Sequence, residues 1–317
     1  MSASFSAPAW LDEALRDEKI TDLCLNGTGS AFADHGNGLE PLGTSWKAEW
    51  RDEEMRSWVL DQISLAGKTW DARFPFIDAT LPSGHRLHVV FPPLARQGML
   101  VSLRRLPSLS IAARGKSRWE SSPLFVPLAE AVKKGDSVLI AGATGSGKTT
   151  LASDLLEQVP SSERIIALED TPELSPRHPH FLTLLSRPPN ADGFGEITLR
   201  TLLRQTLRMR PDRIVLGECR GAEVLDLLQA LNTGHRGALA TLHANSPRDA
   251  LRRVELLCLL SSGGSIPVSA IRELLSVGID WIAQVKRIHA SRQITELWHI
   301  EGKEGDTILM RPVLQTA

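Results

Sequence analysis

The strongest constraint on the fold is a glycine-rich stretch that stands between a short apolar run and a helical segment. It reads GATGSGKTT, covers Gly142–Thr150, and matches the pattern G-x-x-x-x-G-K-[ST] in full. Its glycines let backbone N–H groups curl around phosphates, and a helix begins at the anion. A chance match is the alternative, but the strand before the motif and the helix after it argue against chance. We therefore expect an α/β fold that binds a nucleotide.

The order of elements around this motif predicts a parallel sheet. Four short apolar runs have the pattern of strands, at 137–141, 164–168, 213–216 and 237–242. Helical segments alternate with them, at 148–158, 197–209, 222–231 and 247–260. Short, continuously apolar strands between helices indicate a sheet that is buried on both faces. Ligands of such sheets bind outside the carboxyl ends of the strands, so the residues that follow each strand are the candidates for chemistry.

Three of the strands end in residues that can act on a phosphate. Glu169-Asp170-Thr-Pro-Glu173 places three carboxylates after the second strand. Alone, this would be a solvated turn with a helix cap, but beside a nucleotide a carboxylate can orient the attacking water or the water shell of a metal. Glu218 ends the third strand at the position of a Walker B group. His243 follows the fourth strand, where it can donate to a terminal phosphate oxygen.

Other basic side chains are weaker candidates. His235 precedes the fourth strand and is more typical of a structural residue, although we consider a contact with a carboxylate of residues 169–173. Arg208 and Arg210 precede the third strand, and Arg104 lies near the end of the first 112 residues. Arginines are ordinarily solvated, but phosphoryl transfer benefits from a guanidinium that another domain or subunit often supplies. We include Arg104 and Arg210 among the candidate catalytic residues.

The chain divides by pattern into two domains. Residues 1–112 carry short strand-like runs, turn signals such as Asn26-Gly27 and two helical pieces, which predict a small α+β domain. Residues 113–125 belong to a polar stretch rich in Ser and Arg and form the predicted linker. Residues 126–317 form the predicted nucleotide domain, and their tail from 279 to 314 has strand-like stretches without evident chemistry.

Composition excludes several classes of protein. The 317 residues include 36 Lys and Arg against 37 Asp and Glu, so no overall basic field attracts nucleic acid or a membrane surface. Cys24, Cys219 and Cys258 are far apart and include no C-x-x-C, which disfavours a thiolate zinc site. The N-terminus has no signal-peptide pattern, and no segment reaches about 18 uninterrupted apolar residues. We expect a cytoplasmic protein.

Four motifs in a fixed order resemble one family. They are GATGSGKTT, LEDTPEL, LRMRPDRIVLGECRGAE and LNTGHRGALATLHANSPRDAL. Together they resemble the type II/type IV secretion ATPase superfamily, whose signatures are the Walker A, Asp, Walker B and His boxes. The resemblance is close over 138–260 and looser in the first domain. The residues and spacing of the motifs are most similar to those of the Tad (Flp) pilus assembly ATPases and of the conjugation and type IV secretion ATPases.

This resemblance implies a fold, an activity and an assembly. The fold would be a RecA-like P-loop ATPase core with a smaller, PAS-like α+β N-terminal domain. The protein would hydrolyse ATP with Mg²⁺ to ADP and phosphate, and so power pilus assembly or protein secretion. It would form a homo-hexamer that inner-membrane platform or secretion-channel proteins hold peripherally at the cytoplasmic face of the inner membrane. Direct binding of nucleic acid is not expected.

The resemblance also assigns roles by position in the boxes. Lys148 and Thr149 match the Walker A pair, with Thr149 as a Mg²⁺ ligand. Glu169 matches the Asp-box glutamate, Glu218 the Walker B glutamate that holds Mg²⁺ through water, and His243 the His-box histidine. The nucleotide-binding residues would be Gly142, Ala143, Thr144, Gly145, Ser146, Gly147, Lys148, Thr149 and Thr150.

The arginines complete this assignment. Arg104 matches an arginine of the N-terminal domain that touches the nucleotide phosphate, and Arg208 and Arg210 match positions in the approach to the Walker B box. The sequence does not separate the roles of Arg208 and Arg210.

Two other functions compete with a secretion motor. A RecA-type nucleic-acid motor or a conjugative DNA-transfer ATPase predicts a basic groove or aromatic stacking platforms. The balanced charge and the aromatic content of 5% count against such surfaces. A binding module that has lost turnover is the other alternative, but every expected catalytic position is filled.

Overall fold

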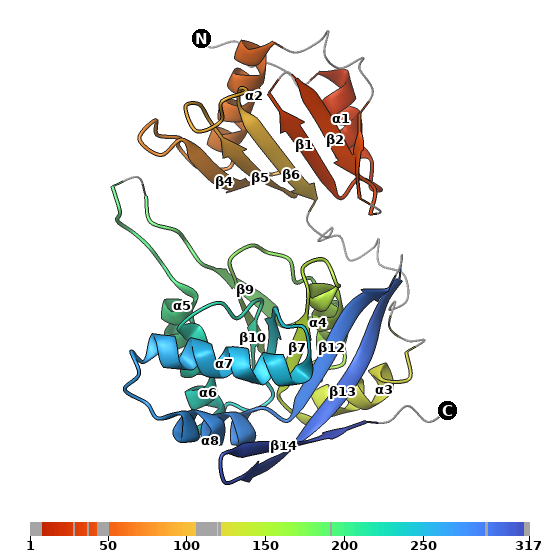
Figure 1. Ribbon diagram of the computed structural model, residues 1–317, viewed down its shortest axis with the longest axis vertical. Coiled ribbons are helices and arrows are strands. Elements are labelled where there is room, and N and C mark those ends of the chain that lie inside the picture. Colours follow the sequence, from red (N-terminus) through yellow and green to blue (C-terminus); the bar gives the residue numbers. More distant parts are fainter. Residues whose placement is uncertain are drawn as a thin grey trace. The chain divides into compact units, whose positions relative to one another are not determined.

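The computed structural model describes residues 8–27, 29–36, 38–42, 51–105, 119, 122–190, 192–288 and 291–313. The chain divides into two compact units, Met1–Leu109 and Ser110–Ala317 (Figure 1). The predicted linker, 113–125, falls largely outside the described residues. Within it, the buried side chains of Trp119, Leu124 and Phe125 pack into the core of the second unit.

The first unit is a six-stranded sheet with helices packed on it. The strands are β1 (Asp22–Asn26), β2 (Ser30–Asp34), β3 (Leu39–Pro41), β4 (Phe76–Thr80), β5 (His85–Val90) and β6 (Leu100–Arg105), in the spatial order β3-β2-β1-β6-β5-β4. All neighbours are antiparallel. Alternate residues of β1, β2 and β5 are buried, so the sheet has one core face. Helices α1 (Ala9–Arg16) and α2 (Asp52–Leu65) contribute side chains to the same core.

The second unit contains six helices and eight strands in its described residues. The helices are α3 (Phe125–Lys134), α4 (Lys148–Leu156), α5 (Leu199–Thr206), α6 (Glu223–Asn232), α7 (Pro247–Ser261) and α8 (Val268–Gly278). The strands are β7 (Val138–Gly142), β8 (Ile165–Glu169), β9 (Phe181–Leu185), β10 (Arg213–Leu216), β11 (Leu239–Leu242), β12 (Trp281–Ile288), β13 (Ser291–Glu304) and β14 (Thr307–Pro312).

These strands form one sheet in the order β14-β13-β12-β7-β11-β10-β8-β9. The six strands from β12 to β9 are parallel, and β13 and β14 add antiparallel pairs at one edge. Every residue of β7, β8, β10 and β11 is buried. Helices α5–α8 share one core with one face of the sheet, and α3 and α4 share another core with the opposite face (Figure 1). The predicted α/β fold with a smaller α+β domain is confirmed.

The elements that sequence patterns missed lie beside the predicted ones. β9 has a mixed pattern of half-buried and exposed residues, as an edge strand does, and α8 was not predicted. The predicted helix at 197–209 is shorter and covers Leu199–Thr206. The tail without evident chemistry forms β12–β14, and β12 lies directly beside β7.

The amino ends of β10 and β11 are fastened by a buried arginine. Arg213 begins β10, and its guanidinium donates to a Glu163 carboxylate oxygen and, at 3.5 Å, to the Gly237 carbonyl. Gly237 has φ +78°, and a Cβ there would lie 2.2 Å from Arg213 Nη1 and 2.9 Å from its Cζ. Only glycine combines this backbone conformation with so close a guanidinium.

We predict that Gly237→Ala lowers the free energy of unfolding by about 2–4 kcal/mol, because it adds a collision with a buried, hydrogen-bonded side chain to the strain of a left-handed backbone. Gly234→Ala is the matched control, since Gly234 has φ +109° but open space where a Cβ would lie. Urea unfolding followed by circular dichroism measures both. Equal losses in the two variants would contradict the role of Arg213.

Candidate functional site

Four adjacent parallel strands bring the candidate residues to one edge of the sheet. The strands lie in the order β7, β11, β10, β8. At their carboxyl ends stand the glycine-rich loop after β7, His243 after β11, Glu218 after β10 and Glu169 at the end of β8. Residues that are about 100 positions apart in sequence thus form one continuous row.

The glycine-rich motif, residues 142–149, runs from the end of β7 to the start of α4, and we call it the P-loop after its sequence pattern. Gly145 and Gly147 have φ of +72° and +100°, which only glycine adopts readily. Lys148 is the first residue of α4 and is largely buried. Its ammonium donates to the Gly142 and Ala143 carbonyls at 3.0 Å each, and burial lowers its pKa. The lysine therefore lies over its own loop, where its charge is available to an anion.

His243 links the lysine to a carboxylate. Its Nε2 lies 2.6 Å from Glu218 Oε1, and its Nδ1 lies 3.4 Å from Lys148 Nζ. Burial, followed by the Lys148 charge, lowers the pKa of His243, while Glu218 opposes this shift. The neutral imidazole fits both contacts, because Nε2–H donates to Glu218 and Nδ1 accepts from Lys148.

Glu218 and its neighbours continue this chain of charges. The Arg220 guanidinium donates to Glu218 Oε2 and, at 3.5 Å, to Asp170 Oδ2. The backbone N–H groups of Arg220 and Gly221 both donate to Glu223 Oε1 at 2.7 Å, which fixes the turn from β10 into α6. Lysine, histidine, carboxylate, arginine and carboxylate thus alternate along the edge.

Glu169 and Glu173 have different environments. Glu169 is 2% exposed, and its Oε1 accepts from the backbone N–H groups of Glu173 and Leu174 at 2.9 Å each. Glu173 instead faces the P-loop, where it accepts from Thr149 Oγ1 at 3.2 Å. A Cβ on Gly217 would lie 2.8 Å from Glu169 Cγ, so only glycine at position 217 leaves room for the buried carboxyl. Glu169 supports the loop, and Glu173 is the carboxylate that meets the P-loop hydroxyl.

The tail that follows the predicted core contributes a residue to this edge. Gln284 of β12 is buried and donates from Nε2 to the Ala244 carbonyl at 3.2 Å, directly after His243. The pairing of β12 with β13 shifts register between Gln284 and Val285, as a β-bulge does beside a site. No sequence motif pointed to Gln284, whereas Glu173 was visible in the carboxylate cluster but was not singled out.

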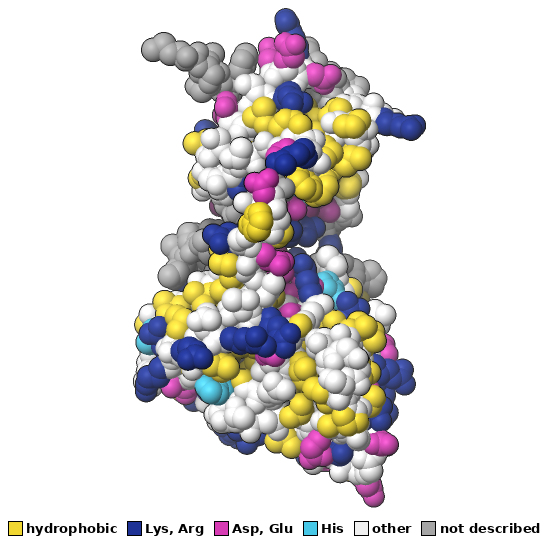
Figure 2. Space-filling model, turned by 90° about the vertical axis from the view of Figure 1, so that its left-hand side faces the viewer, with side chains coloured by type: hydrophobic (Ala, Val, Ile, Leu, Met, Phe, Trp, Pro, Cys, Tyr) yellow, Lys and Arg dark blue, Asp and Glu magenta, His cyan; other side chains and the backbone are white. Residues whose placement is uncertain are grey.

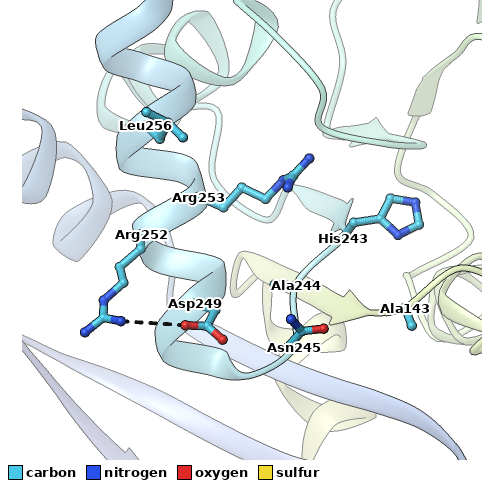
Figure 3. Close-up of a pocket in the computed structure, with 8 residues that line it drawn as sticks. All are labelled: Ala143, His243, Ala244, Asn245, Asp249, Arg252, Arg253 and Leu256. Carbon is cyan, nitrogen blue, oxygen red and sulfur yellow. Dashed lines mark ion pairs between the residues drawn. The ribbon is translucent and has the colours of Figure 1, made fainter.

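Two cavities open along this edge of the sheet. One measures about 410 Å³ and is lined by Ala143, His243, Ala244, Asn245, Asp249, Arg252, Arg253 and Leu256 (Figure 3). The other measures about 290 Å³ and is lined by Ala143, Thr144, Ser146, Ala244, Asn245, Gln284, Val285, Lys286 and Arg287. Ser246 caps α7 by accepting from the Asp249 N–H, and Pro247 begins the helix, so α7 starts beside both cavities.

The structure brings together five of the predicted side chains: Lys148, Thr149, Glu169, Glu218 and His243. Arg104 lies in the first unit, where its Nε donates to Asp22 at 2.7 Å. Arg210 precedes β10, so it lies at the amino edge, and 84% of its side chain is exposed. Their predicted catalytic roles stay predictions.

His235 precedes β11 and also lies at the amino edge of the sheet. The contact considered between His235 and a carboxylate of residues 169–173 is wrong, because those residues follow β8 at the carboxyl edge. In the described residues, no helix is long and apolar enough to cross a membrane, and no three His, Cys, Asp or Glu side chains cluster as metal ligands.

Known proteins are similar to this chain in sequence. A family described as type II/IV secretion system protein matches residues 39–288. A Mycobacterium tuberculosis protein that carries the name of a conjugal transfer protein is 38% identical over 305 residues, covering 93% of this chain and 85% of its own. Type IV secretion system protein PtlH of Bordetella pertussis is 32% identical over 329 residues, covering 91% of this chain and 92% of its own.

Solved structures extend the likeness to three dimensions. The crystal structure of the pilus retraction motor PilT with bound ADP has a TM-score of 0.62 at 19% identity, covering 97% of this chain and 82% of its own. The Legionella pneumophila ATPase DotB has a TM-score of 0.60 at 17% identity, covering 92% and 81%. These likenesses show a common fold.

The buried Glu169 predicts a pH dependence of stability. Burial raises its pKa from 4.5 to about 7 against the two backbone hydrogen bonds, so the folded chain keeps a proton that the unfolded chain releases. The stabilisation is complete below pH 4.5 and is lost as the pH rises to about 7. We expect the free energy of unfolding to fall by at most about 3 kcal/mol across this window.

Urea titrations at several pH values test this expectation in wild type and in Glu169→Gln, which has no titrating carboxyl at position 169. The variant should lose most of the slope. Glu173→Gln is the matched control and should keep most of the slope, because the charge of Glu173 contributes least to the pKa shift of Glu169. A slope that survives in Glu169→Gln would assign the titration to another group.

Proposed function

The chain belongs to the type II/IV secretion system protein family, and from this premise we propose that it hydrolyses ATP to power a secretion or pilus machine. The observation that carries the proposal is the row of side chains at the carboxyl edge, where His243 contacts both the P-loop lysine and Glu218. A P-loop with a lysine, a carboxylate and a neutral imidazole is suited to binding a triphosphate and releasing its terminal phosphate.

Lys148 is proposed to exchange partners when ATP binds. Its ammonium, now on the Gly142 and Ala143 carbonyls, would donate to phosphate oxygens beside the open N–H groups of the loop. The lysine is already buried at this place, so little further desolvation opposes the exchange.

The residues of the site also fit a magnesium ion. Thr149 supplies a hydroxyl oxygen, which Mg²⁺ prefers, and the Glu173 carboxylate 3.2 Å from this hydroxyl lies where it can hydrogen-bond water beside the ion. Bound there with phosphate and water, the ion would supply charge neutralisation to the departing phosphate. Glu218, in the predicted role, would hold its water shell.

The proposed catalytic division of labour follows from burial. Glu173 faces the P-loop hydroxyl and is available to orient the attacking water or to accept its proton. Glu169 Oε1 accepts hydrogen bonds from two backbone N–H groups, so we propose that Glu169 positions Glu173 rather than acting on water. His243 would exchange its contact with Glu218 for one with the terminal phosphate. Binding of that phosphate would then change the contacts of Glu218, which follows the neighbouring strand β10.

The assembly is a further part of the proposal. We propose a homo-hexamer at the cytoplasmic face of the inner membrane, held there by platform or channel proteins, with the Tad pilus machines as the most similar setting. A ring supports the predicted roles of Arg104 and Arg210, because a side chain outside the row can serve the nucleotide of another subunit. Gene neighbourhood and light scattering with and without nucleotide test this part.

The nucleic-acid motor remains the competing function. On the face shown in Figure 2, Lys and Arg side chains of the described residues are interspersed with acidic and apolar ones rather than gathered into one band. Hydrolysis that depends on DNA, with a steep loss at higher salt, would favour that alternative.

ATP turnover tests the proposed activity. Purified protein should release phosphate from ATP in the presence of Mg²⁺, and removal of Mg²⁺ by chelation should abolish the activity. Lys148→Ala should lower the rate by at least about a hundredfold, because Lys148 is the only cationic residue of the loop segment 142–149. Wild-type turnover in that variant would remove the P-loop assignment.

The two glutamates of the loop give a sharper test. Glu173→Gln should lower kcat about a hundredfold or more with nearly unchanged binding of ATP, because it removes a proton acceptor. Glu169→Gln keeps an oxygen for the two N–H groups and should lower kcat less than about tenfold. The opposite ranking would return the direct catalytic role to Glu169.

A further inference from the structure

The 410 Å³ cavity beside His243 is lined by two arginines, which differ in their ion-pair partners. Arg252 and Arg253 both line this cavity, as does Asp249. Arg252 Nη1 lies 3.7 Å from Asp249 Oδ1, so these two charges compensate each other. Within the described residues, no carboxylate forms an ion pair with Arg253. The cavity therefore has an unbalanced positive charge.

The direction of Arg253 places this charge beside the predicted phosphate site. Figure 3 shows Arg253 extending from α7 toward His243, whereas Arg252 turns to Asp249. The same cavity is lined by Ala143, the second residue of the P-loop. The charge of Arg253 also acts on the imidazole of His243, whose pKa it helps to lower.

Two other cations of the edge, Lys148 and Arg220, already have partners, whereas Arg287 of the adjoining 290 Å³ cavity forms no ion pair among the described residues and serves below as a control. Lys148 donates to two loop carbonyls and contacts His243, and Arg220 is held between Glu218 and Asp170. Arg253 faces this cavity without an ion-pair partner of its own among the described residues, so its guanidinium is suited to an incoming anion, and its planar fork matches two oxygens of a phosphate.

We propose that Arg253 binds the terminal phosphoryl group of ATP from the α7 side of the site. The proposal rests on the proposed ATPase function and adds a residue that no box of the sequence assigned. Arg253 then distinguishes ATP from ADP, because the diphosphate has no group that reaches it. His243, directly after β11, and Arg253 of α7 hold the same phosphoryl group, and residues 243–246 join these two elements.

Nucleotide affinity measured by calorimetry on the full chain tests this proposal. The probes are ADP and the slowly hydrolysed analogue ATPγS, each with Mg²⁺. Arg253→Ala should weaken ATPγS about tenfold or more and ADP less than about threefold, as expected for one charge-assisted hydrogen bond. Arg253→Lys should recover part of the loss. Unchanged ADP binding also shows that the variant is folded.

Two control variants locate the anion. Arg252→Ala removes the same charge from the same cavity and should leave the ratio of the two affinities within about threefold of wild type. Arg287→Ala removes an arginine from the adjoining 290 Å³ cavity and should do likewise. A selective loss of ATPγS binding in Arg287→Ala but not in Arg253→Ala would overturn the proposal, as would equal losses in all three variants.

Failure of the proposed function gives a different result. If wild type binds both nucleotides but releases no phosphate from ATP, the proposed ATPase activity is wrong. The ratio of the ATPγS and ADP affinities then still tests the contact of Arg253 with the terminal phosphoryl group. If wild type turns over ATP and Arg253→Ala keeps the full preference for ATPγS, only the Arg253 proposal is wrong. If wild type binds neither nucleotide, both are wrong.

Discussion

The site depends on one buried carboxyl group. Glu169 ends β8 beneath the loop that follows it, and its Oε1 accepts the N–H groups of Glu173 and Leu174. These bonds turn the chain so that Glu173 meets Thr149 at the start of α4. The arrangement requires Gly217 on the adjacent strand, because any side chain there would occupy the space of Glu169 Cγ. Burial of Glu169 against Gly217 thus requires β8 and β10 to lie close together here and positions the Glu173 carboxylate at the P-loop. Its cost, a carboxyl group removed from water, is reduced because the group keeps its proton up to about pH 7.

The charges along the edge balance one another. Lys148 satisfies its ammonium on backbone carbonyls, Glu218 lies between His243 and Arg220, and Arg220 reaches Asp170. The contacts of Lys148 with His243, of His243 with Glu218 and of Arg220 with Asp170 join neighbouring segments of the sheet edge. A new anion that takes one of these donors therefore releases the acceptor that the donor now contacts. This is the physical basis for coupling: a phosphate that captures Lys148 or His243 changes what Glu218 and Arg220 face.

The sequence was informative where a pattern is local. The P-loop, the strands before it and the residues that end those strands follow from apolar runs and turn chemistry within a few positions, and the rule for parallel sheets then placed Lys148, Glu218 and His243 at one edge. What depends on pairing between distant segments was not predictable. Gln284 reaches the His243 loop because β12 adds itself beside β7, and nothing in the tail signals this neighbour. The different roles of Glu169 and Glu173 depend on burial against Gly217, which belongs to a separate segment of the chain. The same rule for parallel sheets separates Arg210 from the candidate residues at the carboxyl edge, since a residue that precedes a strand lies at the amino edge of the sheet.

The two edges of the sheet differ in how firmly they are tied, and this difference bears on how hydrolysis is transmitted. At the amino edge, Arg213 of β10 contacts Glu163, which precedes β8, and the carbonyl of Gly237, which precedes β11, with no space for a side chain at Gly237. At the carboxyl edge, the Cys219 N–H still donates to the Thr241 carbonyl, but His243 and Glu218 pair through their side chains alone. Side-chain contacts exchange partners without breaking strand pairing, and the tied amino edge keeps the strands in register while they do. Under the proposed function, loss of a phosphate would act first on His243, Glu218 and the start of α7, and would reach the rest of the unit as movement of a helix and loops on an unchanged sheet.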